Sequence, residues 1–253
     1  CKADLVTQMV YEFPELQGII GSYYADHSGE NPEVCLAIKE HYRPTFYGDD
    51  PPSSPGGSIV SMADKLDTIL GCIGAGLLPS GSEDPYGLRR HSLGIIQIVL
   101  KQEWQVSLGK LIEKGISLLK EKIKLTPDEV RARTLDLFSQ RYKTLLSDQD
   151  YPYDAVEAVL SADIDSLVDV KQKVIAFSDL KKQPHFEPLA IAFRRIVSIL
   201  NEEADGDVQI KLLKEPAEKK LYNEYQRIKE PVENCLNKKQ FSKALEKIVE
   251  IKE

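Results

Sequence analysis

The sequence predicts an all-α protein, and three observations lead to that fold class. Apolar residues recur with the three-to-four-residue spacing of an amphipathic helix in almost every segment. Alternation of apolar and polar residues, which is typical of a half-buried strand, reaches no useful length. Helix-start signals are also present. Asn31 precedes Pro32 as a cap precedes a proline at the first helical position, and Thr126 with Glu129 has the pattern of a capping box.

The first half of the chain is expected to form six helices separated by proline and glycine. Pro14 stops the first, and Pro85 opens the fifth with Asp84 as its cap. Residues 48–57 (GDDPPSSPGG) are expected to be a loop, or a functional lid, because they cannot hold a regular element. The other helices are expected at 16–24, 32–42, 59–73 and 108–122. The expected apolar stripes are Leu5, Met9, Phe13 with Val6 and Val10 in the first helix, Ile59, Ala63, Leu66, Leu70, Ile73 in the fourth and Leu88, His91, Ile95, Ile98, Val99 in the fifth.

A domain boundary is expected between residues 125 and 126, because the helices that follow are shorter and regularly spaced. Residues 208–213 are interpreted as a strand or a connection, and Pro231 is expected to kink or restart the helix that contains it. A last helix is expected over residues 241–251. Five apolar stripes at helical spacing are expected after the boundary: Leu135, Phe138, Tyr142, Leu145; Val156, Val159, Leu160; Leu167, Val170, Val174, Phe177; Leu189, Phe193, Ile196, Leu200; and Leu221, Tyr225, Ile228, Val232, Leu236.

Composition limits the classes of function. The 253 residues are 42% hydrophobic and 29% charged, as in globular proteins with one large core or two modest ones. No apolar run approaches the ~20 residues that span a bilayer, and no amino-terminal leader pattern is seen, so a soluble, cytoplasmic protein without a membrane partner is expected. A net charge of −7 argues against a generally basic nucleic-acid binder, and DNA is not an expected partner, although local basic clusters can still meet phosphate.

Asp4 and Asp64 each lie on an otherwise apolar amphipathic segment. A buried carboxylate without a partner is costly, so such a residue normally binds a metal, pairs with a base or caps a helix. Two helices with one carboxylate each suggest a metal-site scaffold of the HD phosphohydrolase kind, which also needs histidines. None of the four histidines lies within four residues of either aspartate or forms an HD or HExxH pair. Structural carboxylates are therefore favoured over a metal site.

Other catalytic patterns are missing from the sequence. It contains no Gly-x-Ser-x-Gly nucleophile elbow and no glycine-rich phosphate-binding loop. The four cysteines follow no metal-binding or disulfide spacing. The residues alone therefore indicate a helical binding module without catalytic residues.

Several runs of the chain closely resemble the beta subunit of the bacterial heterotetrameric glycyl-tRNA synthetase. The resemblance continues in order over nearly the whole chain and is most specific in the first hundred residues. The runs are KADLVTQMV (2–10), EFPELQG (12–18), AIKEHYRP (37–44), IVSMADKLDT (59–68), PSGSEDPYGLRRHSLG (79–94) and EPAE (215–218).

The resemblance implies a fold and a set of partners. Residues 1–125 are expected to form an HD-like helical domain, and residues 126–253 a helical-bundle anticodon-binding-type domain of the DALR kind, truncated at its C-terminal end. ATP-dependent activation of glycine, with its Mg, is expected on the alpha subunit, so no cofactor is expected in this fragment. The expected partners are tRNA(Gly) and the alpha subunit, in an alpha2beta2 heterotetramer.

The resemblance also carries over to the HD positions. Ala3 and Asp4 fall where an HD hydrolase has His-Asp, and Asp64 falls where it has its later aspartate. Alanine removes one ligand, which implies a degenerate HD domain without metal or hydrolase activity. Both aspartates then become framework carboxylates that pair with Lys2 or Lys65.

Basic side chains are the expected tRNA contacts, because phosphate contacts position RNA. Tyr142 could stack a base, but it lies on a core stripe, and a core role is favoured. Two alternatives remain open: a metal-dependent HD phosphohydrolase, and a pure assembly module of the beta subunit. The candidate tRNA-binding residues are Arg89, Arg90, Lys101, Arg131, Arg133, Arg141 and Lys143, with further basic pairs at Lys181-Lys182 and Arg194-Arg195.

Overall fold

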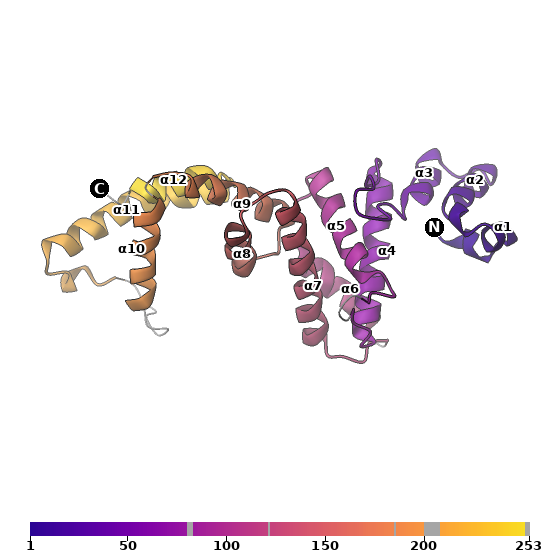
Figure 1. The fold of residues 1–253 in the computed structure, drawn as a ribbon, viewed down its shortest axis with the longest axis horizontal. Coiled ribbons are helices and arrows are strands. Elements are labelled where there is room, and N and C mark those ends of the chain that lie inside the picture. The colour runs from indigo at the N-terminus through magenta and orange to yellow at the C-terminus, as the bar shows by residue number, and fades with distance from the viewer. Residues whose placement is uncertain (80–82, 121, 185, 200–207, 251–253) are drawn as a thin grey trace. The chain divides into compact units, whose positions relative to one another are not determined.

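The computed structural model describes residues 1–79, 83–120, 122–184, 186–199 and 208–250 (Figure 1). Within these residues the ordered elements are α-helices and short 3-10 turns, without a β-strand, so the all-α class is confirmed for the described part of the chain. Contacts divide the chain into two compact units, residues 1–150 with 160–168 and residues 151–159 with 169–253. The domain boundary expected at 125/126 remains a prediction.

Helices α4, α5 and α7 form the centre of the first unit, where they run side by side, and α6 packs against α4 and α7 (Figure 1). Fully buried apolar side chains from these helices, including Ile69, Ile96 and Phe138, make up its core. Figure 1 labels the helices of this unit as follows: α1 (Gln8–Glu12), α2 (Ile19–His27), α3 (Pro32–Glu40), α4 (Pro55–Gly74), α5 (Leu88–Gln102), α6 (Leu108–Leu119) and α7 (Pro127–Asp148), with 3-10 turns η1 (Ala3–Val6) and η2 (Pro14–Leu16).

The predicted helix starts at Asn31 and Thr126 are confirmed. The side chain of Asn31 accepts the N–H of Glu33 at the start of α3. Thr126 and Glu129 form a full capping box at the start of α7, in which Glu129 Oε2 accepts the Thr126 N–H at 2.9 Å and Thr126 Oγ1 accepts the Glu129 N–H at 3.3 Å. Each cap satisfies N–H groups that have no partner within their helix.

Glu40, at the end of α3, joins that helix to the start of α4. Its buried carboxylate accepts hydrogen bonds from the backbone N–H and the hydroxyl of both Ser53 and Ser54, at 2.6 to 3.0 Å. Burial by itself raises the pKa of a carboxyl, but these four hydrogen bonds outweigh it and lower the pKa of Glu40 from 4.5 to about 2. Glu40 is therefore an anionic clamp between two helices.

The predicted apolar stripe of the first segment is confirmed only at Val10, which is buried. Leu5, Met9 and Phe13 are 41 to 51% exposed, and Val6 is 91% exposed. The chain breaks at Thr7 into η1 and α1, because the Thr7 hydroxyl donates to the Asp4 carbonyl at 2.7 Å and its oxygen then caps α1. Because of this break, η1 and α1 do not share the single apolar face that one continuous helix would present.

Three helix predictions are corrected near the following turns. The 16–24 helix begins instead at Ile19, after η2. The loop expected over residues 48–57 ends at Ser54, whose side chain caps α4 by accepting the N–H of Gly57. The helix expected from Pro85 begins at Leu88, and the Asp84 carboxylate still caps it by accepting the N–H groups of Leu88 and Arg89 at 2.8 and 2.9 Å.

The buried face of α4 also differs from the predicted stripe. Ile59 is 59% exposed, while Ser58, Ser61 and Lys65 are buried together with Ile69. The Lys65 ammonium donates to the carbonyl oxygens of Tyr42 and Arg43 and to Ser61 Oγ, at 2.9 to 3.1 Å. These carbonyls have no helical partner, so a lysine inside the unit satisfies them.

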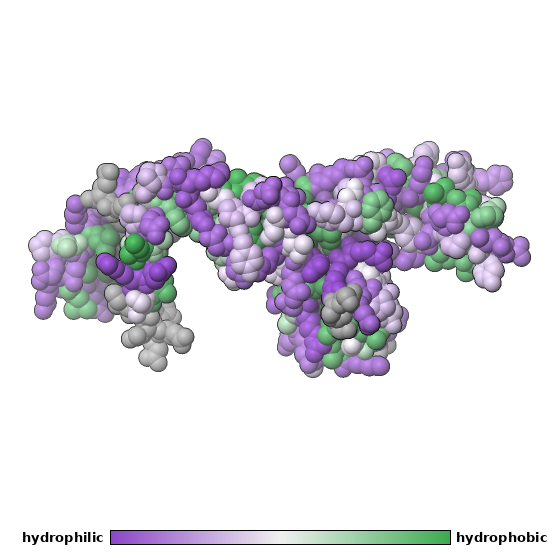
Figure 2. Space-filling model, viewed as in Figure 1, coloured by the Kyte–Doolittle hydropathy of each residue, from purple (hydrophilic) through white to green (hydrophobic). Residues whose placement is uncertain are grey.

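The second unit buries less apolar surface than the first. Phe193 and Ile196 of α10 are about half exposed, which contradicts their predicted place on a core stripe; Leu200 of that stripe lies outside the described residues. Hydrophobic side chains are visible at the surface around α10, α11 and α12 (Figure 2). The remaining helices are α8 (Tyr153–Ala162), α9 (Leu167–Lys181), α10 (Phe186–Ile199), α11 (Pro216–Asn237) and α12 (Phe241–Val249), with the 3-10 turn η3 (Ile210–Leu212).

Two uncertain segments of this unit are now assigned. Residues 208–213 contain a 3-10 turn and no strand, and α11 continues through Pro231 without restarting. Residue 251 of the last predicted helix lies outside the described residues, and α12 ends at Val249. None of the described helices combines the length and apolar character that crossing a membrane requires.

Candidate nucleic-acid interface

Three of the predicted arginines meet in one hollow of the first unit. We call it the arginine hollow; its volume is about 300 Å³. Arg89 and Arg90 come from the first turn of α5, and Arg141 comes from the second half of α7, fifty residues later in the chain. The full lining is Pro44, Phe46 and Tyr47 from the connection between α3 and α4, Arg89, Arg90, Leu93 and Gln97 from α5, and Arg141, Thr144, Leu145 and Asp148 from α7.

Local hydrogen bonds fix each wall of the arginine hollow. The Asp84 carboxylate caps α5 and so determines where Arg89 and Arg90 leave the helix. The Tyr142 hydroxyl donates to the Leu167 carbonyl at 2.6 Å, which anchors α7 beside Arg141. The core role favoured for Tyr142 is confirmed, because its ring is completely buried.

The third wall is a loop with two exposed aromatic side chains. Phe46 and Tyr47 are 62% and 57% exposed. Asp49 holds this loop by accepting hydrogen bonds from the Thr45 N–H at 2.7 Å and the Thr45 hydroxyl at 2.9 Å. Partial burial by itself raises the pKa of Asp49, but the hydrogen bonds from Thr45 and the charge of Arg43 outweigh this effect. The pKa of Asp49 is therefore lowered, and its carboxylate stays anionic. The aromatic pair is thus presented by a constrained turn.

The charge of the arginine hollow is positive on balance. Three guanidinium groups line it together with one carboxylate, Asp148. Partial desolvation, the hydrogen bond to Asp148 and the charge of Asp148 all raise the pKa of Tyr47, so its hydroxyl remains a neutral donor. Nε of Arg141 is buried and has no hydrogen-bond partner among the described residues. The three arginine side chains that line the hollow suit an anionic ligand, because guanidinium groups donate charge-assisted hydrogen bonds.

The other predicted basic residues do not line this hollow. Lys101 is exposed and donates to the Pro51 carbonyl at 3.3 Å, and Arg131 lies 3.4 Å from the Glu113 carboxylate. Arg133 is exposed on α7, and Lys143 is half-buried on the same helix. In the second unit, Lys181 pairs with Asp154, Lys182 pairs with Asp179, and the Arg194-Arg195 pair is exposed on α10.

The two HD-position carboxylates have structural partners. Asp4 is buried, and its Oδ2 accepts the N–H groups of Gly18 and Gly21 at 2.6 and 3.2 Å, so it caps the start of α2. Asp64 pairs with the Lys2 ammonium at 2.5 Å. Ala3 is exposed in η1. The cap and the ion pair are two of the three roles expected for such aspartates.

Histidines that are distant in sequence do approach this region. His41 is fully buried; burial lowers its pKa although the charge of Asp64 acts in the opposite direction, and its Nδ1 lies 2.6 Å from the Ile38 carbonyl. Burial also lowers the pKa of His91, again against the charge of Asp64. Within the described residues, however, no group of three or more His, Cys, Asp or Glu side chains is arranged to hold a metal ion. The absence of a metal in the protein remains a prediction.

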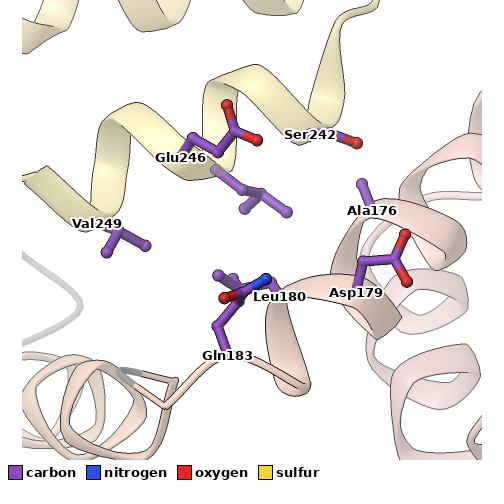
Figure 3. A pocket seen from close by; sticks show the side chains of 8 residues that line it. Ala176, Asp179, Leu180, Gln183, Ser242, Glu246 and Val249 are labelled. Atoms are coloured by element: carbon purple, nitrogen blue, oxygen red, sulfur yellow. The ribbon is translucent and has the colours of Figure 1, made fainter.

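The second unit has a hollow of different character. It lies between α9 and α12 and has a volume of about 330 Å³ (Figure 3). Asp179 and Glu246 are its charged lining side chains, and Leu180, Leu245 and Val249 are among its apolar lining residues. Two carboxylates oppose phosphate binding. Of these two hollows, only the arginine hollow suits a polyanion.

Sequence reasoning missed Phe46, Tyr47 and Asp148 in the arginine hollow. A signal for the aromatic pair exists. Phe46 and Tyr47 lie between Pro44, which ends a helix, and the glycine and proline loop, so they belong to no apolar stripe. Aromatic side chains outside a stripe are candidates for surface contacts. Asp148 carries no comparable signal in the sequence.

This site and fold define a class of protein: a helical module with an arginine-lined, aromatic-edged recess. The chain belongs to the family of glycyl-tRNA synthetase beta subunits, since the family model described as "Glycyl-tRNA synthetase beta subunit" matches residues 1–161. Three similar relatives are glycine–tRNA ligase beta subunits. That of Geobacter sulfurreducens is 47% identical over 92% of this chain and 34% of its own, that of Geotalea daltonii 44% over 100% and 36%, and that of Trichlorobacter lovleyi 43% over 100% and 36%. The chain spans about a third of the length of these curated relatives.

Proposed function

We propose that this chain is a tRNA-contacting, noncatalytic part of a glycine–tRNA ligase, which joins glycine to tRNA(Gly) with conversion of ATP to AMP and diphosphate. Its partner is an alpha subunit, in an alpha2beta2 assembly, that carries the active site together with ATP and Mg. The chain itself uses no cofactor, and the enzyme works in the cytoplasm. Membership of the beta-subunit family supports this proposal.

One observation of the structure carries the tRNA-contacting role. Arg89, Arg90 and Arg141, from two helices, meet in the arginine hollow beside two exposed aromatic residues. Phosphate groups are bound most strongly by arginine, whose planar guanidinium donates two parallel hydrogen bonds. A chain with net charge −7 binds RNA only through such a local concentration of positive charge. The remaining predicted contacts, Lys101, Arg131, Arg133 and Lys143, are proposed as peripheral.

The test is a titration of tRNA(Gly) with the 253-residue chain at two salt concentrations. An Arg90→Gln and Arg141→Gln double variant removes two positive charges from the hollow. An Arg131→Gln and Arg133→Gln variant removes the same charge elsewhere and is the matched control. We expect binding that weakens steeply with salt, a large loss of affinity and a smaller salt slope in the hollow variant, and a smaller loss in the control. Equal losses in the two variants would contradict a site in the hollow.

Hydrolase activity is the less supported alternative. Asp4 Oδ2 accepts two backbone N–H groups and Asp64 is paired with Lys2, which are contacts of the kind that a framework role requires; Asp4 Oδ1 is buried without a hydrogen-bond partner among the described residues. A phosphohydrolase role predicts phosphate release from nucleotides that depends on a divalent metal and is lost in Asp64→Asn. A negative result for the wild-type chain with added metal would end this alternative.

Assembly within the beta subunit is a second candidate function, and one observation favours it. An apolar groove of about 620 Å³ lies between α4 and α6, with Asp67 and Lys114 as its charged lining residues. Leu118 and Ile59 at this groove are 73% and 59% exposed. Such a surface is typical of a docking site for a helix. This role can be tested by tryptophan fluorescence, because Trp104 lines the groove and is the only tryptophan of the sequence. The emission of Trp104 is compared between the 253-residue chain and a longer beta subunit in which the other tryptophans are replaced.

A further inference from the structure

We propose that the arginine hollow binds one unstacked RNA nucleotide, with the base against Phe46 and Tyr47 and the phosphate held by Arg90 and Arg141. This inference rests on the proposed RNA-contacting function and makes it more specific. It assigns the hollow to single-stranded or looped RNA and excludes a duplex as its preferred ligand.

The size of the hollow limits what it can hold. At about 300 Å³ it lies at the small end of ligand sites, which suits one nucleotide better than a longer segment. Its walls come from a loop and from two helices packed on one core, so the recess is part of a well-ordered unit. A site of this kind admits one base that has left its stack.

The aromatic pair supplies the reason to expect a base. Phe46 and Tyr47 expose more than half of their surface in a turn that Asp49 fixes. Exposed aromatic side chains beside positive charge are the common feature of proteins that bind single-stranded nucleic acid, because every base has a face that can stack. Bases inside a duplex are already stacked on one another and cannot offer that face.

The charged groups determine how the nucleotide is oriented in the arginine hollow. Arg90 and Arg141 both line the recess, and Arg90 is exposed there. Their guanidinium groups donate hydrogen bonds to the phosphate. Asp148 repels phosphate and is engaged by the Tyr47 hydroxyl, so it keeps the phosphate on the arginine side and the base on the aromatic side.

The experiment compares two RNA probes of equal phosphate number: a short single strand and a hairpin that is duplex over most of its length. Binding of the 253-residue chain is measured by fluorescence anisotropy at two salt concentrations. The test variant is Phe46→Leu with Tyr47→Leu, which keeps apolar volume and removes the rings. Arg90→Gln with Arg141→Gln is the charge variant, and far-UV circular dichroism with Trp104 emission controls for folding.

We expect the single strand to bind more tightly than the hairpin. The ring variant is expected to lose about 10-fold or more of its affinity for the single strand, with an unchanged salt slope and unchanged hairpin binding. The charge variant is expected to reduce the salt slope for both probes. A third variant, Phe46→Trp, keeps an aromatic ring at this position and should show fluorescence quenching on contact with the single strand, which tests stacking even if the double leucine variant does not fold.

Two results would overturn the inference in different ways. If the rings can be removed without loss and Phe46→Trp is not quenched, while the charge variant still weakens binding, then the hollow contacts only the RNA backbone and the proposed function stands. If the wild-type chain binds neither probe at low salt, the proposed RNA-contacting function fails together with this inference.

Discussion

Helix α5 of the first unit and helix α10 of the second have similar lengths, 15 and 14 residues, and both have apolar residues at helical spacing. Ile95 and Ile96 of α5 are 2% and 0% exposed, whereas Phe193 and Ile196 of α10 are 48% and 50% exposed. The difference lies in the neighbours, because α5 packs against both α4 and α7. Amphipathic sequence provides a helix with an apolar face, and only a partner element buries it.

Buried polar groups separate the two units in the same way. Glu40 and Lys65 are buried and hydrogen-bonded in the first unit, and such groups are stable only in a well-packed surrounding that supplies their partners. In the described part of the second unit, Ser178 is the buried polar side chain. The comparison predicts that the first unit is the more stable and the more sensitive to substitution.

The largest expected effect comes from a matched pair of phenylalanines. Phe138→Ala should lower the free energy of unfolding by about 3 to 5 kcal/mol, because its ring is fully buried and leaves a cavity. Phe193→Ala should cost less than about 1 kcal/mol, because half of that ring is already in water. Urea unfolding of the 253-residue chain, followed by Trp104 emission for the first unit and far-UV circular dichroism for the whole chain, measures both. A cost above about 2 kcal/mol for Phe193→Ala would show that α10 is packed in solution.

The next effect concerns Glu40 and its low pKa. Because the pKa falls from 4.5 in the unfolded chain to about 2 in the folded chain, ionised Glu40 contributes about 3 kcal/mol, which is fully present above pH 4.5 and lost as the pH falls toward 2. Glu40→Gln should remove this contribution near neutral pH and flatten the acid side of the stability profile. The control is Glu33→Gln on the same helix, which is exposed and should cost about 0.5 kcal/mol or less. If the stability of the wild-type chain changed with pH as little as that of Glu40→Gln, this would contradict the role of Glu40 as an anionic clamp.

Lys65 should cause a second rise of stability with pH, in a higher pH range than that of Glu40. Burial lowers its pKa from 10.5 to about 8, so between these values the unfolded chain binds a proton that the folded chain does not. Stability should therefore rise by about 2 kcal/mol from pH 8 to pH 10, and this rise should vanish in Lys65→Met. Above pH 10 the trend should reverse, since burial raises the pKa of Tyr42 from 10.0 to about 12.

Unfolding curves at several pH values measure this dependence. The exposed Lys101→Met serves as the control for loss of a lysine. It should leave the rise between pH 8 and pH 10 intact. An unchanged rise in Lys65→Met would show that other groups cause it.

The last pair of effects comes from two glycines of α4, and these effects should differ in sign. A Cβ at Gly57 would lie 2.6 Å from Glu40 Oε2 and 2.8 Å from Ser54 Oγ, so Gly57→Ala should destabilise the first unit by about 1 to 3 kcal/mol. A Cβ at Gly71 meets nothing within 4 Å, so Gly71→Ala should stabilise by about 0.5 to 1 kcal/mol through helix propensity. Thermal unfolding of the two variants measures both changes in stability. Changes of the same sign would contradict the close packing around Glu40.

The sequence by itself determined the features that depend on local interactions. The all-α class, the caps at Asn31 and Thr126 and the buried stripe of α5 follow from spacing and from side chains within a few residues of one another. The family was also evident from continuous runs such as residues 59–68, whose order does not depend on the fold. Local rules failed where a side chain redirected the chain, as Thr7 does between η1 and α1.

Only the tertiary structure decided which faces are buried and which distant residues meet. The periodicity of α4 allows several rotations about its axis, and the carbonyls of Tyr42 and Arg43 selected the one that places Lys65 inside. Arg90 and Arg141 are fifty-one residues apart and meet Phe46 because α5 and α7 pack on one core. A helical repeat fixes directions within one helix, whereas the position of one helix against another depends on contacts that no local pattern contains.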